Sequence, residues 1–330
     1  MSERFKALVV DKKNDRFSVS IETLSLHDLP ESDVLIKVRY SSVNYKDSLA
    51  SIPDGKIVSS YPFIPGVDLA GTVVSSKDRR FRKGDRVIAT GFGIGVSHFG
   101  GYSEYARIPA DWLVPLPDGL TLAEAMIFGT AGFTAALSIQ KLEDSGLTPA
   151  DGKVLVTGAT GGVGSLAVAM LAKSGYQIVA STGKETERDY LHRLGAKEVI
   201  SRQDVCPGKM RKLDKQLWAA AVDPVGGNTL AAVLSKTSYG GAVAVSGLTG
   251  GTDVPTTVYP FILRGVSLLG IDSVYCPMDL RKKIWQRMAS DLNPGKVLAS
   301  LRKEIGLQDL PGTLPLLLKG RSRGRMIVRL

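Results

Sequence analysis

The chain has 330 residues, 44% of them hydrophobic and 22% charged, which is the composition of an ordinary globular protein and a length that suits two domains. Its two cysteines, Cys206 and Cys276, are too few for a disulfide framework and have no metal-ligand spacing with the three histidines. No apolar run reaches the roughly 18 residues that span a bilayer, and the first residues lack the apolar stretch of a signal peptide. We therefore expect a cytoplasmic protein with no membrane partner.

The formal net charge of +10 is compatible with nucleic acid, an anionic membrane or an anionic metabolite as a partner. Lysines and arginines fall into short groups at 79–83, 209–215, 281–283 and 321–329. None of these groups forms a nucleic-acid-binding motif, so we expect no nucleic-acid partner. Two explanations stay open, a solvated basic surface and the attraction of phosphate-bearing ligands.

In chain order, residues 5 to about 122 alternate short apolar runs with Gly, Pro, Asp and Asn, as at 34–40 and 71–75. This pattern is typical of a β-rich domain. From Ala123 a helical stretch leads into strands that alternate with helices, a pattern typical of a doubly wound parallel sheet. Six strands are predicted there, at 154–157, 177–181, 197–200, 219–223, 242–246 and 267–271. An amphipathic helix over 279–292 and a final strand over 325–329 end the chain.

The most specific motif is the apolar strand at 154–157, which runs directly into a glycine-rich turn. Gly158, Gly161 and Gly164 allow a sharp bend, close approach of backbone to a pyrophosphate, and packing of the next helix on the strand. The helix, expected over 166–174, then presents free N–H groups to phosphates. The next apolar run at 177–181 completes a βαβ unit, so the motif predicts a dinucleotide-binding sheet.

The end of the second strand of this unit predicts the nucleotide. NAD-binding sheets usually place an Asp or Glu there for the ribose 2′-OH, whereas this chain has Ser-Thr-Gly-Lys at 181–184. We therefore expect NADPH, with Thr182, Gly183 and Lys184 near its 2′-phosphate. The alternative is that Lys184 is a solvated loop residue beside Glu185.

Five separated motifs, in this order along the chain, resemble those of the medium-chain dehydrogenase/reductase superfamily. They lie at 44–47 (Asn-Tyr-Lys-Asp), 64–68 (Ile-Pro-Gly-Val-Asp), 129–134 (Gly-Thr-Ala-Gly-Phe-Thr), 154–164 and 272–275 (Asp-Ser-Val-Tyr). Together they look like the YhdH/YhfP group of quinone oxidoreductases, which includes NADPH-dependent acrylyl-CoA reductases. The resemblance implies an α/β chain with a GroES-like catalytic domain over 1–124, a Rossmann NADPH-binding domain over 125–272, and the return of 273–330 to the first domain. It also implies a homodimer formed through the exposed edge of the nucleotide-binding sheet.

The chain departs from the zinc-dependent alcohol dehydrogenases of this superfamily. Those enzymes have a Cys ligand in the segment matching 44–47, a Gly-His-Glu matching 66–68, and in many cases a four-cysteine lobe near 95–110, all of which are absent here. We therefore predict no zinc site and no polarisation of a carbonyl by metal. Hydrogen-bond donors would then activate a quinone or an alkene conjugated to a carbonyl.

The resemblance implies that the 44–47 motif lies beside the nicotinamide. Tyr45 is the expected donor, because a phenol can stabilise an oxyanion or pass a proton. Asn44 and Asp47 are also expected in the catalytic site, where they would orient the substrate or the neighbouring backbone. The alternative is that Asn44 and Asp47 only fix a turn and that Tyr45 packs on the coenzyme without transferring a proton.

Further coenzyme contacts are carried over where local motifs match. Arg202 follows the third strand of the sheet, and a guanidinium fits a phosphate in a bidentate manner. For the other positions strand-end geometry is an equally open explanation. The full set of expected coenzyme-binding residues is Tyr45, Thr134, Thr160, Gly161, Gly162, Val163, Thr182, Gly183, Lys184, Arg202, Leu248, Ile262, Ser273 and Arg325.

The sequence thus predicts a zinc-independent, NADPH-dependent oxidoreductase that transfers hydride to a quinone or to an α,β-unsaturated carbonyl compound, including an enoyl thioester such as acrylyl-CoA. The alternative is an NADPH-binding protein without turnover, either a regulator or an RNA-binding protein, since fold and coenzyme motif do not guarantee catalysis.

Overall fold

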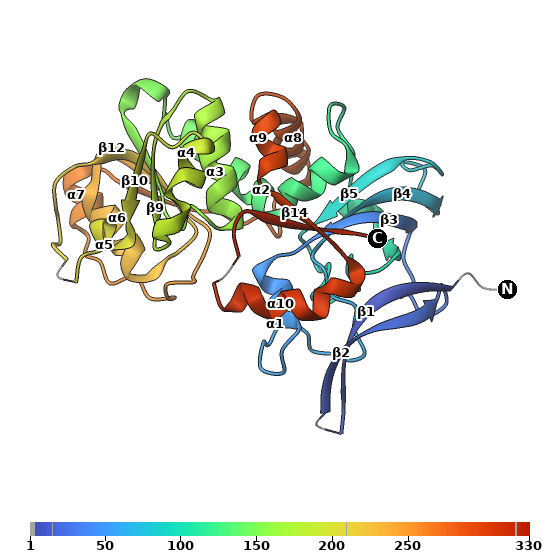
Figure 1. The fold of residues 1–330 in the computed structure, drawn as a ribbon. Coiled ribbons are helices and arrows are strands. Elements are labelled where there is room, and N and C mark those ends of the chain that lie inside the picture. Colours follow the sequence, from blue (N-terminus) through green and yellow to red (C-terminus); the bar gives the residue numbers. More distant parts are fainter. Residues whose placement is uncertain (1–3, 15, 209, 321) are drawn as a thin grey trace. The chain divides into compact units, whose positions relative to one another are not determined.

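The computed structural model describes residues 4–14, 16–208, 210–320 and 322–330, which form two compact units (Figure 1). The first unit contains the chain up to Thr130, Val274–Lys282 and Leu301–Leu330, and the second contains Ala131–Ser273 and Lys283–Ser300. The second unit thus includes part of the predicted return segment 273–330. The reason is packing, because Trp285 stacks on Phe133 with ring centroids 6.3 Å apart.

The first unit is built on a seven-stranded sheet in the order β14-β15-β3-β4-β5-β7, with β6 paired to β3. All pairs are antiparallel except β14 with β15. The strands are β3 (Val34–Ser42), β4 (Asp68–Ser76), β5 (Arg86–Thr90), β6 (Tyr105–Ile108), β7 (Leu113–Pro115), β14 (Arg302–Gly306) and β15 (Arg325–Arg329). A separate hairpin contains β1 (Arg4–Lys13) and β2 (Arg16–Ser25). The final strand lies beside β3, so the end of the chain returns to the first unit.

Side chains alternate along β3, where Val34, Ile36 and Val38 are buried and join one hydrophobic cluster. This is the alternation expected of a strand with one face on a core. The helical segments that accompany the sheet are short: α1 (Tyr45–Ala50), η1 (Ala110–Trp112), η4 (Leu307–Asp309) and α10 (Leu310–Leu318).

The second unit contains a parallel sheet of six strands in the order β10-β9-β8-β11-β12-β13. Its strands are β8 (Lys153–Val156), β9 (Gln177–Thr182), β10 (Glu198–Ser201), β11 (Trp218–Asp223), β12 (Thr237–Val245) and β13 (Ser267–Gly270). Val154, Leu155 and Val156 are all fully buried, as in a sheet covered on both faces. The predicted α/β fold class is confirmed, and the strand order reverses between β8 and β11, where such sheets bind ligands.

The second unit also contains short and medium-length helices, most of which lie between its strands along the chain. They are η2 (Pro149–Asp151), α3 (Gly162–Lys173), η3 (Glu185–Glu187), α4 (Arg188–Arg193), α5 (Arg202–Val205), α6 (Gly227–Lys236), α7 (Tyr259–Arg264) and α9 (Lys296–Ser300), while α8 (Met278–Ala289) begins in the first unit. The predicted start of α3 at Leu166 is wrong by one turn, because the glycines of the motif are themselves helical from Gly162. The predicted end of the amphipathic helix at Leu292 is also wrong, since α8 ends at Ala289.

The longest helix, α2 (Leu122–Asp144), is interrupted at Gly129, whose φ of 49° and ψ of −155° are not helical. By length and hydropathy alone α2 could cross a membrane, but 78% of its most apolar stretch is buried in the protein. It therefore has the character of a core helix.

Candidate functional site

The turn between β8 and α3 has the shape expected of a phosphate-binding turn. Gly158 has a φ of +52°, a conformation that disfavours other residues, and a Cβ on Gly164 would overlap the carbonyl oxygen of Gly158. Gly161 caps α3 in an extended conformation, and a Cβ there would lie no closer than 3.3 Å to a neighbour. The first N–H groups of α3, from Gly162 and Val163 onward, have no acceptor within the helix and can face a phosphate.

Four residues predicted near a 2′-phosphate are brought together at the ends of β9 and β10. Ser201 pairs with Thr182 across the two strands, so α5 begins beside Gly183. A Cβ on Gly183 would lie 2.8 Å from Nη2 of Arg202, which means that the guanidinium lies against this glycine. The N–H of Lys184 donates to Oγ1 of Thr182 (3.0 Å). The Arg202 guanidinium thus lies against Gly183, and Lys184 follows it in the chain, at a strand end where NAD-binding sheets usually have a carboxylate.

The remaining predicted coenzyme residues of the second unit differ in exposure. Thr134 and Thr160 are buried, whereas Leu248 and Ile262 are 62% and 68% exposed. Leu248 belongs to a loop that is tied to the turn after β11, because Gly250 N–H donates to Val225 O (2.8 Å). Ser273 is half-buried beyond β13. Their coenzyme contacts stay predictions.

Asp223 ends β11 at the same edge of the sheet, and its carboxylate closes the following turn. It accepts hydrogen bonds from Thr157 Oγ1 (2.5 Å) and from the N–H of Val225 (2.8 Å). Burial raises its pKa above the usual value. These contacts give Asp223 a structural role in the turn.

In the first unit, the 44–47 motif forms the start of α1. Asn44 precedes the helix in an extended conformation and donates its N–H to Oδ2 of Asp47 (2.8 Å). Oδ1 of Asp47 accepts a hydrogen bond from the N–H of Val67 (2.9 Å). This buried carboxylate therefore links α1 to the residue that precedes β4. Tyr45 is 45% exposed at the first helical position. Of the three predicted catalytic residues, Tyr45 therefore has the most accessible side chain.

Both polar groups of the Asn44 side chain are engaged within the protein. Its Nδ2 donates to Oδ2 of Asp68 (2.7 Å), and its Oδ1 accepts from Nη1 of Arg325 (3.2 Å). Asp68 also accepts from Ser42 Oγ and from Thr130 Oγ1, each at 2.5 Å. Asn44 is thus held in one orientation by a charged pair at the beginning of β4 and β15.

Arg325 is 3% exposed and donates to four oxygen atoms of the first unit. Nε donates to the carbonyl of Ile127 (2.9 Å), Nη1 to that of Val43 (3.1 Å) and to Asn44 Oδ1, and Nη2 to Ser42 Oγ (2.8 Å). Its Nη2 lies 3.8 Å from Oδ2 of Asp68. This occupancy favours a positioning role for Arg325 over the predicted direct contact with the coenzyme.

The break in α2 gives Asp68 its remaining donors. Thr130 follows Gly129 and donates its N–H as well as its hydroxyl to the Asp68 carboxylate (2.9 and 2.5 Å). A Cβ on Gly129 would lie 2.5 to 2.8 Å from atoms of Asp68, Ser42 and Arg325. Only glycine fits where the helix backbone passes this polar cluster.

Burial dominates the electrostatics of this cluster. It raises the pKa of Asp47 to about 7, with the Asp68 charge acting in the same direction and the N–H donors of Asn44 and Val67 opposing it. Tyr102 is fully buried, and burial together with the Asp47 charge raises the pKa of its phenol. Burial also lowers the pKa of Arg325. The pKa of Asp47 therefore lies near neutral pH.

The family's zinc ion does not fit these residues. The positions that match its ligands are 44–47 and 66–68, where the carboxylates of Asp47 and Asp68 already accept N–H and O–H donors of the protein. Neither cysteine nor histidine, the ligands that zinc prefers, occurs at these positions. Within the described ranges, no group of three or more His, Cys, Asp or Glu side chains could hold a metal ion.

Four further residues of this cluster were not predicted from the sequence: Ser42, Asp68, Tyr102 and Thr130. Asp68 and Thr130 lie within quoted motifs, at 64–68 and 129–134, and a motif aspartate after an apolar run was a usable signal. For Ser42 and Tyr102 the sequence holds no such signal, because their role depends on contacts between residues far apart in the chain, such as the hydrogen bond from the Tyr102 hydroxyl to the carbonyl oxygen of Ser42 (3.2 Å).

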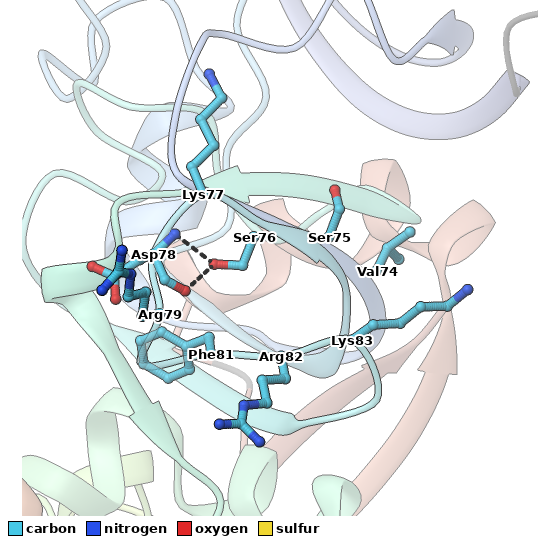
Figure 2. Close-up of a pocket in the computed structure, with 9 residues that line it drawn as sticks. All are labelled: Val74, Ser75, Ser76, Lys77, Asp78, Arg79, Phe81, Arg82 and Lys83. Carbon is cyan, nitrogen blue, oxygen red and sulfur yellow. Dashed lines mark hydrogen bonds between the residues drawn. The ribbon is translucent and has the colours of Figure 1, made fainter.

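A basic hollow of about 620 Å³ lies at the turn between β4 and β5, lined by residues 74–79 and 81–83. Figure 2 shows that its cationic side chains point apart, with Lys77, Arg82 and Lys83 in three different directions. Lys77 is paired with Glu31 (3.1 Å). Divergent cations do not form a cradle for a phosphate, so this hollow is not a candidate site.

Comparison with known proteins gives the family. Residues 30–118 match the alcohol dehydrogenase GroES-like domain, and residues 162–290 match the zinc-binding dehydrogenase domain. The two matches and the fold define the class, and the chain belongs to the medium-chain dehydrogenase/reductase superfamily.

Similar proteins show to which group of this superfamily the chain belongs. YhfP of Bacillus subtilis (strain 168) is 61% identical over 330 residues, which is all of both chains, and the acrylyl-CoA reductase AcuI of Ruegeria pomeroyi is 50% identical over 98% of each. The crystal structure of yhfP with NAD bound superposes with a TM-score of 0.98 at 60% identity, with both chains covered in full. That of yhdH from Salmonella enterica in complex with NADP gives 0.96 at 47% identity, covering 98% and 99%. The chain is an oxidoreductase of this YhfP/YhdH group, as the motifs predicted.

Proposed function

We propose that the chain is a zinc-independent, NADPH-dependent oxidoreductase that transfers hydride to a quinone or to an α,β-unsaturated carbonyl compound, with an enoyl thioester such as acrylyl-CoA as one candidate. The observation that carries this proposal is the guanidinium of Arg202, which lies against Gly183 at the end of β9, with Lys184 as the next residue in the chain. A guanidinium and an ammonium can bind the 2′-phosphate of NADPH, whereas the ribose 2′-hydroxyl of NAD is usually bound by a carboxylate.

The candidate acceptors come from named relatives. AcuI of Ruegeria pomeroyi is named an acrylyl-CoA reductase, and a protein of Sus scrofa that is 29% identical over 284 residues is named quinone oxidoreductase. The net charge of +10 favours the thioester, because coenzyme A carries several phosphate charges. The alternative of a coenzyme-binding protein without turnover has no such support from these relatives.

In this proposal the bound coenzyme supplies the hydride. The hydroxyl of Tyr45 donates to the acceptor oxygen on which negative charge develops, and the proton needed to complete the reduction comes from this phenol. Asn44 and Asp47 position the start of α1, and thereby Tyr45, through the contacts to Asp68, Arg325 and Val67. Tyr45 is the catalytic residue, and Asn44, Asp47 and Arg325 are positioning residues.

The coenzyme is tested with a Lys184→Ala/Arg202→Ala variant. Since both cations would bind the 2′-phosphate, we expect its affinity for NADPH to fall by about 10²-fold, the result of losing two charge-assisted contacts, and its affinity for NADH to stay within about twofold. Binding is measured by nucleotide fluorescence, with Lys173→Ala on α3 as a surface control. An equal loss for both nucleotides would remove these residues as selectors.

The acceptor is tested by the absorbance loss of NADPH with acrylyl-CoA and with a benzoquinone, after dialysis against a chelator. We expect NADPH-dependent turnover of the thioester. Turnover of the quinone alone would favour the quinone oxidoreductase, and no turnover with either would favour the non-catalytic alternative.

We further propose a homodimer that forms through β13, the edge strand of the parallel sheet. Unpaired backbone groups of an edge strand favour pairing with a second copy. Exposed apolar side chains on and near this edge support it: Val258, Tyr259, Ile262, Leu263 and Leu268. A cytoplasmic location is likewise proposed, since Cys206 and Cys276 are free thiols, as expected in a reducing compartment.

A further inference from the structure

Ser246 follows β12 directly, at the carboxyl edge of the parallel sheet. Its N–H donates to the carbonyl oxygen of Asp223 (3.0 Å), which continues the pairing of β11 with β12 by one residue. Open α/β sheets bind ligands outside this edge, close to the point where the strand order reverses. Ser246 thus lies at the edge of the sheet where folds of this kind bind dinucleotides.

The hydroxyl of Ser246 is buried and has no hydrogen-bond partner among the residues that the structure describes. Neighbouring hydroxyls at the same edge are engaged, since Thr157 Oγ1 donates to Asp223 Oδ1 and Thr182 Oγ1 accepts the N–H of Lys184. Folded proteins seldom leave a buried polar atom unpaired, and a bound ligand can supply the missing partner. The unpaired hydroxyl therefore indicates a ligand that brings its own polar group to this edge.

We propose that Ser246 is a coenzyme-binding residue whose hydroxyl bonds the nicotinamide riboside half of NADPH. This inference rests on the proposed function, which puts the adenosine 2′-phosphate at the end of β9. β12 lies on the other side of β8, three strands from β9 in the sheet order, or about 14 Å at roughly 4.8 Å per strand. The nicotinamide ribose hydroxyls and carboxamide offer both donors and acceptors, and a serine hydroxyl can serve either.

The test compares two ligands on the native chain and on Ser246→Ala. NADPH has both halves of the coenzyme, whereas adenosine 2′,5′-bisphosphate has only the half that would bind at β9. Losing one neutral hydrogen bond should weaken NADPH about 3- to 10-fold and leave the bisphosphate unchanged. Ser238→Ala, near the amino end of the same strand, is the matched control and should change neither affinity.

Thermal unfolding without ligand separates binding from a structural role. Because the hydroxyl has no partner among the described residues, Ser246→Ala should melt at the native temperature or above it, while its stabilisation by NADPH is smaller. Unchanged NADPH affinity, or an equal loss for both ligands, would overturn the inference. If the native chain bound neither ligand, the proposed coenzyme itself would be wrong, and the inference would fail with it.

Discussion

At the scale of single residues, Tyr45 differs from Asn44 and Asp47, the other two predicted catalytic residues of the 44–47 motif. Asp47 is fully buried and Asn44 has both side-chain polar groups bonded within the protein, while Tyr45 is 45% exposed. A side chain whose polar groups are hydrogen-bonded within the protein can position its neighbours, but those groups are not available to a substrate. The three predicted catalytic residues of the motif therefore divide into one accessible phenol and two side chains that are engaged within the protein.

Replacing Tyr45 tests this division. Tyr45→Phe keeps the ring and removes the hydroxyl, so we expect the turnover number with the better acceptor to fall by about 10²-fold or more, as for a lost general acid. The dissociation constant for NADPH should stay within about twofold. Steady-state kinetics and nucleotide fluorescence measure the two quantities, with the exposed Tyr239→Phe as control. Native turnover in Tyr45→Phe would leave the phenol without a role in the reaction.

Asp47 predicts a pH dependence of stability. Burial raises its pKa from 3.8 to about 7 in the folded chain, so the folded state binds this proton more tightly than the unfolded state. The contribution of Asp47 to the free energy of unfolding therefore falls as pH rises from about 4 to about 7, and is constant above that. Thermal unfolding at intervals across this range should show a steeper fall for the native chain than for Asp47→Asn. Parallel curves would mean that Asp47 titrates as an ordinary carboxyl.

At the scale of elements, the break in α2 is the feature on which the polar cluster depends. A continuous helix would carry Thr130 N–H into a bond with the helix, whereas the break at Gly129 directs it to Asp68 (2.9 Å). The positive φ of Gly129, and the three atoms that a Cβ would meet within 2.8 Å, both require glycine there.

We expect Gly129→Ala to lower the free energy of unfolding by about 3 kcal/mol or more, because a Cβ would both strain the backbone and displace Asp68, Ser42 or Arg325. Gly320→Ala is the control, since Gly320 has a similar φ of +65° with nothing within 4 Å, and should cost about 1 kcal/mol. Chemical denaturation measures both. Equal losses in the two variants would show that close packing at Gly129 carries no cost.

Much of this architecture could be predicted at the level of elements. The six parallel strands follow from apolar runs of strand length, and the phosphate-binding turn follows from glycine spacing, because both are local patterns. The polar cluster could not be predicted in full, since it joins residues 42, 68, 130 and 325, and strand pairing over nearly the whole chain decides which of them meet. The break at Gly129 could not be predicted for the same reason, because the residues that crowd Gly129 include Asp68 of β4 and Arg325 of β15, which are distant in sequence.

At the scale of the whole molecule, the proposed homodimer depends on pairing through the edge strand β13. Leu268 is 40% exposed on this strand, so a charge there would place a cation in the proposed interface. We expect the native chain to sediment at twice the chain mass and Leu268→Lys to shift toward the monomer. Leu316→Lys, in α10 and 42% exposed, is the control and should remain dimeric. A native chain that sediments as a monomer would contradict the dimer.

The position of β15 has a consequence for the order in which the chain is made. β15 pairs with both β14 and β3, and Arg325 at its start is the cation beside the buried Asp68 carboxylate. Most of the second unit, Ala131–Ser273, is complete on the ribosome before these last residues emerge. Until they do, residues 40–42 of β3 lack their partner strand and Asp68 lacks its counter-charge. We therefore expect the first unit, although begun earlier, to be the later of the two to reach its final packing.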